Sequence, residues 1–169
     1  MIYHHLYEKF AKKDRVFAGV IGAGNYGTAI VTQEPHTPRL TVAAVADITA
    51  DAARKAYEQA GIDGDGIVYC STAEQAQAEI EKGRHVYTDQ CEMIAQIPII
   101  DVVCESTGIP EASAKYALDS IRRGKHVAMI TKDCDASVGP ILKKLADEHG
   151  VVYTPVDGDQ HGLLIQMYE

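Results

Sequence analysis

Short runs rich in apolar residues alternate with helical stretches along the whole 169-residue chain. We predict strands at residues 15–22, 40–47, 66–70, 99–107, 126–131 and 151–157, with a weaker candidate at 85–89. Strands that alternate with helices form parallel sheets, because each helix carries the chain back to the start of the next strand. The sequence therefore predicts an α/β fold of the doubly wound Rossmann type. It has about six mostly parallel strands, with helices on both faces.

The predicted helices have recognisable ends. Residues 25–33, 51–61, 71–83, 110–125 and 137–150 form the helices between the strands. Pro110 suits a first helical position, Gly61 suits a position just past a helix end, and Ser71 with Glu74 forms a capping box. A further amphipathic helix is predicted before the first strand, because one helical face there carries Tyr3, Leu6, Tyr7 and Phe10.

Charge and cysteine usage exclude several classes of function. The net charge is −8, and acidic residues are spread along the chain, which argues against nucleic acid or an anionic membrane as a partner. No apolar run approaches the roughly 18–20 residues of a membrane span, and the N-terminal segment does not resemble a signal peptide. The four cysteines show no C-x-x-C spacing, so we expect free thiols and a cytoplasmic protein without a metal site.

A glycine motif follows the first predicted strand and opens the next helix. Residues 22–27 read Gly-Ala-Gly-Asn-Tyr-Gly and fit G-x-G-x-x-G. In a dinucleotide-binding fold, Gly22 permits a tight turn, Gly24 lets the backbone approach the pyrophosphate, and Gly27 lets the helix pack on the strand. Asp47 ends the second strand, where a carboxylate binds the adenine ribose. We therefore predict that the cofactor contacts Gly22, Ala23, Gly24, Asn25, Tyr26, Gly27 and Asp47. A purely structural turn is the alternative.

The choice between NAD and NADP stays open. Asp47 would repel a 2′-phosphate, which favours NAD. However, Thr49 lies in the loop after Asp47, and Arg54 and Lys55 lie on the next helix. A rotated Asp47 would leave room among them for the 2′-phosphate of NADP.

Two further segments end strands at the edge where a ligand should lie. Glu105, Ser106, Thr107 and Gly108 lie at the end of the fourth strong strand and are predicted to face the cofactor. Capping of the next helix is the alternative role for Ser106 and Thr107. Thr131 and Lys132 follow the next strand, where an ammonium would stabilise developing negative charge. The alternative for Lys132 is an ion pair with Asp133 or Asp135, a carboxylate pair that we do not predict to bind a metal.

These motifs together resemble the nucleotide-binding domain of homoserine dehydrogenase-like NAD(P)-dependent oxidoreductases, in the branch that includes deoxyxylulose phosphate reductoisomerase-like enzymes. The resemblance runs through residues 19–27, 42–48, 101–108, 124–133 and 150–162. It implies NAD(P)-dependent hydride transfer on a small carbonyl or hydroxy substrate that can carry a phosphate. It also implies a role for Lys132 beside nicotinamide and substrate, although the family usually has Thr-Ala-Asn-Lys where this chain has Ile-Thr-Lys.

The resemblance further implies a second, catalytic and dimerising region. We expect residues 1–169 to be one nucleotide-binding domain, cut from a larger homo-oligomeric enzyme, because residues 161–169 read as an unfinished helix. Asp159 and His161 suit either an acid–base pair or a loop toward that second region. A stand-alone NAD-responsive regulator is an alternative, but no basic DNA-binding helix is visible. A sugar oxidoreductase of the glucose–fructose type is disfavoured because Lys132 is followed by Asp and not by Pro.

Overall fold

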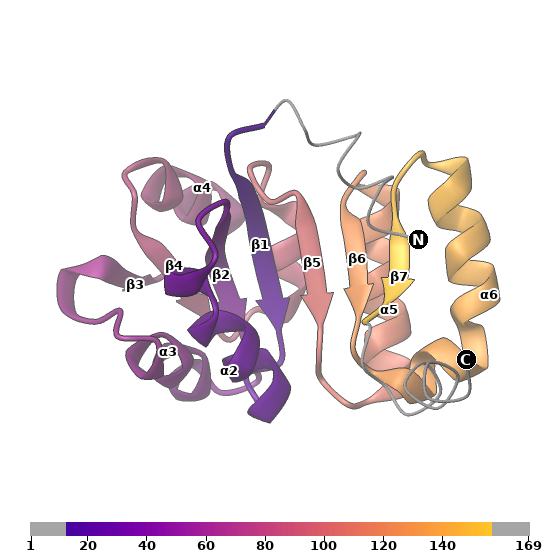
Figure 1. Ribbon diagram of the computed structural model, residues 1–169, viewed down its shortest axis with the longest axis horizontal. Coiled ribbons are helices and arrows are strands. Elements are labelled where there is room, and N and C mark those ends of the chain that lie inside the picture. The colour runs from indigo at the N-terminus through magenta and orange to yellow at the C-terminus, as the bar shows by residue number, and fades with distance from the viewer. Residues whose placement is uncertain (1–12, 157–169) are drawn as a thin grey trace.

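A computed structural model of the protein describes residues 13–156. The strands of these residues form one parallel sheet (Figure 1). The seven strands lie side by side in the order β3-β4-β2-β1-β5-β6-β7, and every neighbouring pair is parallel. The strands are β1 (Val16–Ile21), β2 (Leu40–Ala46), β3 (Ile67–Tyr69), β4 (His85–Thr88), β5 (Val102–Glu105), β6 (His126–Met129) and β7 (Tyr153–Pro155). The doubly wound α/β prediction is confirmed.

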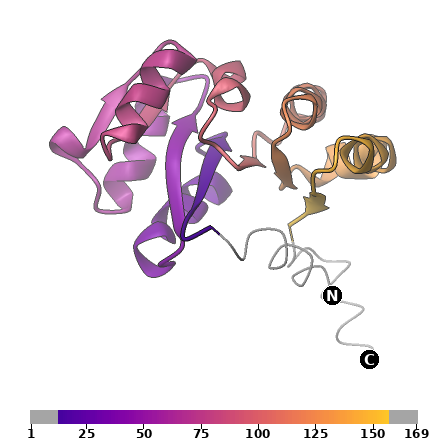
Figure 2. The same ribbon diagram turned by 90° about the horizontal axis from the view of Figure 1, so that it is seen from above.

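Helices cover both faces of the sheet (Figure 2). One face carries α4 (Ala73–Glu81), the 3₁₀-helix η3 (Cys91–Gln96), α5 (Pro110–Arg122) and α6 (Lys132–Glu148), while α2 (Asn25–Thr32) and α3 (Ala50–Gln59) pack on the other. Two further 3₁₀ turns, η1 (Glu34–His36) and η2 (Gly64–Gly66), lie in the connections. Packing is close where η3 crosses β1, because a Cβ on Gly19 would lie 2.4 Å from Cγ2 of Ile94.

Several predicted element boundaries need correction. The weak candidate at residues 85–89 is a full member of the sheet, since β4 pairs with both β2 and β3. The last helix begins at Lys132 and not at Ser137, and it accommodates Pro140 in its interior. The cap of α4 is Thr72 and not Ser71, because the Thr72 hydroxyl accepts a hydrogen bond from the Gln75 amide. The predicted helix that holds Tyr3 and Phe10 lies outside the described residues.

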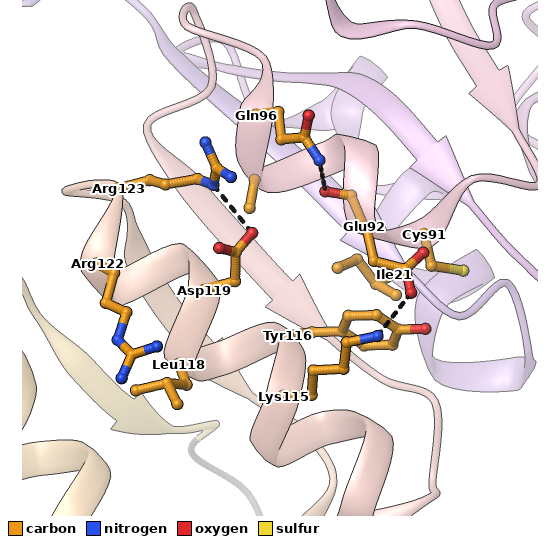
Figure 3. A pocket seen from close by; sticks show the side chains of 11 residues that line it. Ile21, Cys91, Glu92, Gln96, Lys115, Tyr116, Leu118, Asp119, Arg122 and Arg123 are labelled. Atoms are coloured by element: carbon orange, nitrogen blue, oxygen red, sulfur yellow. Dashed lines mark hydrogen bonds and ion pairs between the residues drawn. The ribbon is translucent and has the colours of Figure 1, made fainter.

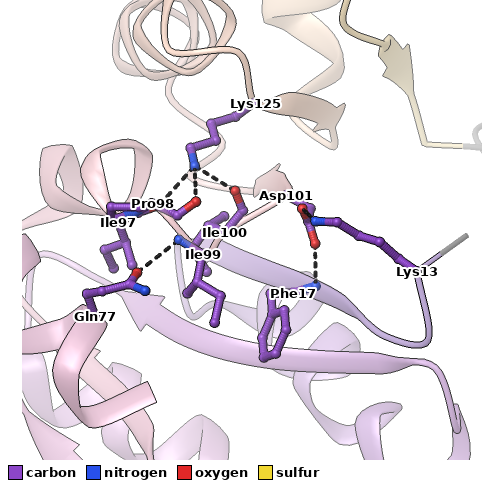
Figure 4. A network of polar contacts seen from close by, with 9 residues as sticks. All are labelled: Lys13, Phe17, Gln77, Ile97, Pro98, Ile99, Ile100, Asp101 and Lys125. Carbon is purple, nitrogen blue, oxygen red and sulfur yellow. Dashed lines mark hydrogen bonds and ion pairs between the residues drawn. The ribbon is translucent and has the colours of Figure 1, made fainter. Parts of the chain in front are cut away.

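The amino ends of β5 and β6 are joined by a buried lysine (Figure 4). Nζ of Lys125 donates to three main-chain carbonyls, those of Ile97 at 3.0 Å, Pro98 at 2.8 Å and Ile100 at 2.7 Å. Asp101 continues this edge by accepting from the amide of Phe17 at 3.0 Å. Lys125 thus fixes the chain between η3 and β5, where it crosses from one side of β1 to the other.

That crossing determines where a ligand can lie. The chain places β2, β3 and β4 on one side of β1 and then returns to place β5, β6 and β7 on the other side. The connections that follow β1 and β5 therefore leave the sheet in opposite directions and open a crevice at its carboxyl edge. Open α/β sheets bind their ligands at such switch points.

Candidate functional site

The glycine motif occupies this switch point, between the carboxyl ends of β1 and β5. Gly22 has a φ of +94°, and a Cβ there would lie 2.7 Å from the carbonyl carbon and oxygen of Ser106. A Cβ on Gly27 would lie 1.9 Å from the carbonyl oxygen of Gly22. The fold itself therefore requires these two glycines, as the motif predicts.

Gly24 has no such structural reason to be glycine. Its φ is −72° and its ψ is −165°, an extended conformation that other residues adopt freely. A Cβ built on it would meet no other described atom within 4 Å. Gly24 is also the N-cap of α2, and no side chain makes a capping hydrogen bond to the first amide groups of this helix. This combination is what binding an anion at a helix N-terminus needs.

Asp47 lies beside the glycine loop at the end of β2. Its Oδ2 accepts a hydrogen bond from the amide of Ala23 at 2.8 Å, and its Oδ1 accepts from the amide and hydroxyl of Thr49 at 3.1 and 3.3 Å. Asp47 therefore holds the loop as well as ending the strand. The sequence prediction placed it at the ribose and did not foresee its bond to Ala23.

The turn after β5 is tied to the glycine loop from the other side. The hydroxyl of Ser106 is a donor at hydrogen-bond distance from two carbonyl oxygens, that of Gly22 at 2.7 Å and that of Ile21 at 3.0 Å. The amide of Gly108 donates to Oγ1 of Thr131 at 3.0 Å, which links this turn to the end of β6. The structure thus brings Gly22, Ser106, Gly108 and Thr131 to one edge.

Lys132 is adjacent to this edge, as the first residue of α6. Its side chain is exposed, and Thr131 before it is buried. Asp135, one of the two carboxylates predicted as alternative partners of Lys132, accepts a hydrogen bond from the phenol of Tyr153 at 2.9 Å. The pair of Asp159 and His161 lies outside the described residues.

Glu105 is the residue whose role the sequence did not reveal. It was grouped with the ligand-facing residues after β5, but the structure places it under the edge with no exposed surface. Its Oε1 accepts from the amide of Thr107 at 3.0 Å and from the hydroxyl of Thr107 at 2.6 Å. The hydroxyl of Thr107 also lies 3.1 Å from that of Ser113 in the first turn of α5. The amide and hydroxyl of Thr107 are therefore already hydrogen-bonded within the protein, which leaves fewer of its polar groups for a ligand.

A groove of about 330 Å³ lies between η3 and α5, and Ile21 at the end of β1 is one of its lining residues (Figure 3). Two ion pairs flank it, Lys115 with Glu92 and Arg123 with Asp119, each at 2.9 Å. Burial raises the pKa of Cys91 in its wall to about 11, so this thiol is unreactive near neutral pH. None of the predicted site residues lines the groove.

The four cysteines match the expectation of free thiols. Cys70, Cys91, Cys104 and Cys134 are all buried and none is in a disulfide. Within residues 13–156, no helix is long and apolar enough to cross a membrane. The same residues contain no group of three or more histidine, cysteine or acidic side chains that could hold a metal ion.

Several solved structures share this fold. GenD2 from gentamicin A biosynthesis, crystallised with NAD, superposes over 84% of this chain with a TM-score of 0.59 and 19% identity. An NAD-binding oxidoreductase from Klebsiella pneumoniae matches 92% of the chain with a TM-score of 0.62 and 18% identity. A homoserine dehydrogenase from Thiobacillus denitrificans matches 83% with a TM-score of 0.57 and 20% identity.

The likeness is one of fold and not of close sequence. No protein-family model matches the chain, and no curated protein matches it. The chain spans only 34%, 38% and 29% of the three solved structures, in the order given above. The class defined by fold and edge geometry is a Rossmann-type α/β domain with a glycine-rich first crossover.

Proposed function

We propose that this chain is the nucleotide-binding domain of an NAD(P)-dependent oxidoreductase of the homoserine dehydrogenase-like kind. The dinucleotide would lie across the carboxyl edge, with its adenosine at Asp47, its pyrophosphate at residues 22–27 and its nicotinamide over the turn at residues 106–108. Two of the similar structures are a homoserine dehydrogenase and an NAD-binding oxidoreductase, and a third, GenD2, was solved in complex with NAD. Hydride transfer is chemistry that the cofactor supplies, while the protein binds and orients it.

The observation that carries this proposal is the contrast among the three glycines of the motif. Gly22 and Gly27 are required by contacts within the protein, but Gly24 is not. A glycine that the fold does not need, at an uncapped helix N-terminus, is explained by the close approach of a ligand to its backbone. A structural turn alone would explain only two of the three glycines.

The remaining assignments follow from this placement. Lys132, at the start of α6, would face the nicotinamide and the substrate, and its ammonium would stabilise negative charge on a carbonyl oxygen. The chain spans about a third of the similar structures, which supports a further region that completes the substrate site and forms a homo-oligomer. A small-molecule substrate and a cytoplasmic setting complete the proposal.

Substitution of Gly24 by valine tests the proposal directly. We expect Gly24→Val to weaken binding of NAD(H) and NADP(H) by about 100-fold or more, because the side chain would occupy the space of the pyrophosphate. The measurement is titration of reduced nucleotide fluorescence, supported by calorimetry with the oxidised forms. Because a Cβ on Gly24 has no contact within 4 Å, the circular dichroism spectrum and melting temperature should stay close to those of the wild type.

Gly66→Val is the matched control. Gly66 lies in η2 at the amino edge, has no left-handed φ, and its added Cβ would meet only Ile62 at 3.6 Å. This variant should keep the wild-type affinity. If Gly24→Val binds nucleotide as well as Gly66→Val does, or if the wild type binds no pyridine nucleotide, the proposal is wrong.

A further inference from the structure

Glu105, at the end of β5, is fully buried, and within the described residues its side chain bonds only to the turn that follows. Its Oε1 lies 3.0 Å from the amide nitrogen of Thr107 and 2.6 Å from the hydroxyl oxygen of the same residue. Both forms of the carboxyl group make these two bonds. A carboxylate accepts both, and an acid protonated at Oε1 accepts from the amide and donates to the hydroxyl oxygen. Glu105 therefore holds Thr107 in either protonation state.

Packing of the sheet does not explain a carboxyl group at this position. Glu105 pairs in register with Ile21 of β1 and Met129 of β6, both buried and apolar. Burying a carboxyl group is unfavourable, and its Oε2 has no hydrogen-bond partner among residues 13–156. An apolar side chain would fill this strand position without that cost. The bonds to Thr107 are what the carboxyl group adds, and they fix the shape of the turn.

Each residue of the turn after β5 is held by a hydrogen bond to a different part of the protein. Ser106 is bonded to the glycine loop, and Gly108 is bonded to the end of β6. Thr107, between them, is bonded to Glu105, and its hydroxyl lies 3.1 Å from that of Ser113 in the first turn of α5. The turn is therefore held from three sides, and Glu105 supports its middle residue.

The main chain of this turn keeps acceptors available for a ligand. Among residues 13–156, no donor bonds to the carbonyl oxygens of Ser106, Thr107 and Gly108. Because β5 flanks β1 on the side opposite β2, a dinucleotide with its adenosine at Asp47 places its nicotinamide half over this turn. That half carries hydrogen-bond donors, namely the ribose hydroxyls and the N–H groups of the carboxamide. The turn and the nicotinamide half are therefore complementary in their hydrogen bonding.

We propose that Glu105 is a positioning residue for the nicotinamide half of the cofactor. Its carboxyl group holds Thr107, and Thr107 in turn sets the direction in which the turn presents its carbonyl oxygens. Glu105 does not contact the cofactor itself, and its action does not depend on its charge. The inference rests on the proposed function, because it requires the dinucleotide to lie at the carboxyl edge.

The experiment compares Glu105→Leu with the wild type, using NADH as the whole ligand and ADP as the half that lacks nicotinamide. If the wild type prefers NADPH, then NADPH and adenosine 2′,5′-bisphosphate take their places. Leucine is of similar size but cannot bond to Thr107. By titration calorimetry, we expect the dissociation constant of NADH to rise about tenfold, the scale of one or two hydrogen bonds to a turn that is no longer preformed. The dissociation constant of ADP should change by less than about twofold, because the glycine loop is untouched.

Two further variants show whether the bonds to Thr107 cause the effect. Glu105→Gln has an amide group that can accept from Thr107, so it should keep the wild-type dissociation constants for both ligands. A loss of NADH affinity in Glu105→Gln as large as that in Glu105→Leu would overturn the inference. Thr107→Val removes the hydroxyl at the other end of the bond and should also weaken NADH selectively. The double variant should be no weaker than Glu105→Leu alone. Should Glu105→Leu not fold, Thr107→Val carries the same test.

Ser120→Ala is the matched control for loss of a buried polar side chain. Ser120 is also fully buried, and its hydroxyl donates to the carbonyl of Tyr116 within α5. This variant should leave both dissociation constants unchanged, and a selective loss of NADH affinity in it would overturn the inference. Equal weakening of NADH and ADP by Glu105→Leu, or no weakening of either, would do the same, as would a wild type that binds NADH no more tightly than ADP. A wild type that binds neither ligand would instead contradict the proposed function.

Discussion

Lys125 and Glu105 are both buried ionisable side chains that hold a loop against the sheet, at opposite edges of it. Lys125, 9% exposed, has an acceptor for each of its three ammonium protons, and all are main-chain carbonyls of residues 97–100. Glu105, at 0% exposure, has donors for one of its two oxygens and none for the other within the described part of the chain. The ammonium group of Lys125 is fully satisfied, and the carboxyl group of Glu105 is not.

This difference separates a structural role from a functional one. Buried polar atoms almost always have partners, because leaving one unpaired costs about 1–3 kcal/mol. Proteins tolerate such costs mainly at functional sites. The amino edge is thus explained by folding alone, while the carboxyl edge keeps an uncapped helix, a glycine without a packing role and an unpaired carboxylate oxygen.

The largest effect on stability should come from Lys125→Met, which removes the three hydrogen bonds of Lys125 at the amino edge. Methionine has a similar length but cannot donate, so three carbonyls lose their partner. We expect a loss of about 3 kcal/mol in the free energy of unfolding, measured by urea denaturation, because hydrogen bonds to charged groups contribute about 1.5–3 kcal/mol each and the carbonyls regain water only in part. Nucleotide affinity of the folded protein should not change.

Lys82→Met is the control for loss of a lysine as such. The side chain of Lys82 is 62% exposed and its ion pair among the described residues is with Glu79, so its removal should cost less than about 0.5 kcal/mol. Equal costs for the two variants would show that the three carbonyl bonds contribute little. A loss of nucleotide affinity in Lys125→Met would show that the two edges are coupled.

Thr131→Val should have an intermediate effect, on both stability and binding. Valine fills the same space, but the amide of Gly108 loses the acceptor that lies 3.0 Å away. We expect about 1–2 kcal/mol of destabilisation and a several-fold weaker nucleotide affinity, because the turn after β5 is held less firmly. Thermal unfolding and fluorescence titration measure the two effects.

Thr41→Val provides the matched comparison at the amino edge. Among the described residues, the hydroxyl of Thr41 accepts from Arg15 at 3.2 Å, and a guanidinium can turn to water instead. This variant should cost little stability and no affinity. If both threonine variants lower affinity alike, the turn after β5 has no special part in binding.

The sequence predicted most of the fold for definite physical reasons. Near-continuous apolar runs such as residues 40–46 predict strands buried on both faces, and β2 is buried along all but its first residue. Gly61 predicts a helix end and has a φ of +78° just beyond α3. The start of α6 was misplaced, because Lys132 and Asp133 resemble loop residues. Pro140, near the start of the predicted helix, lies in the interior of the observed one.

The candidate site was predictable to the level of motifs but not of side-chain partners. The spacing of the glycines and of Asp47 depends on local backbone geometry, which sequence patterns encode. The bonds of Asp47 to Ala23 and of Ser106 to Gly22 join residues 24 and 84 positions apart, and no local pattern encodes such pairs. The burial of Glu105 was missed for the same reason, since the surrounding helices α5 and α6 come later in the chain.

Asp47 gives the smallest expected effect and the sharpest test of the comparison between the two edges. Both of its carboxylate oxygens have hydrogen-bond donors, as the ammonium of Lys125 has acceptors, yet Asp47 lies at the carboxyl edge. It has three hydrogen bonds, all within the loops at that edge. If it also faces the adenine ribose, Asp47→Ser should shift the ratio of the NAD and NADP dissociation constants toward NADP by about fivefold, or about 1 kcal/mol, because repulsion of a 2′-phosphate is removed. Asp51→Ser is the control for charge alone, since Asp51 lies nearby but pairs with Arg54 and Lys55. Equal shifts in the two variants would mean that Asp47 supports the glycine loop without contacting the ribose. At both edges, a buried side chain whose polar atoms all have partners would then have a structural role.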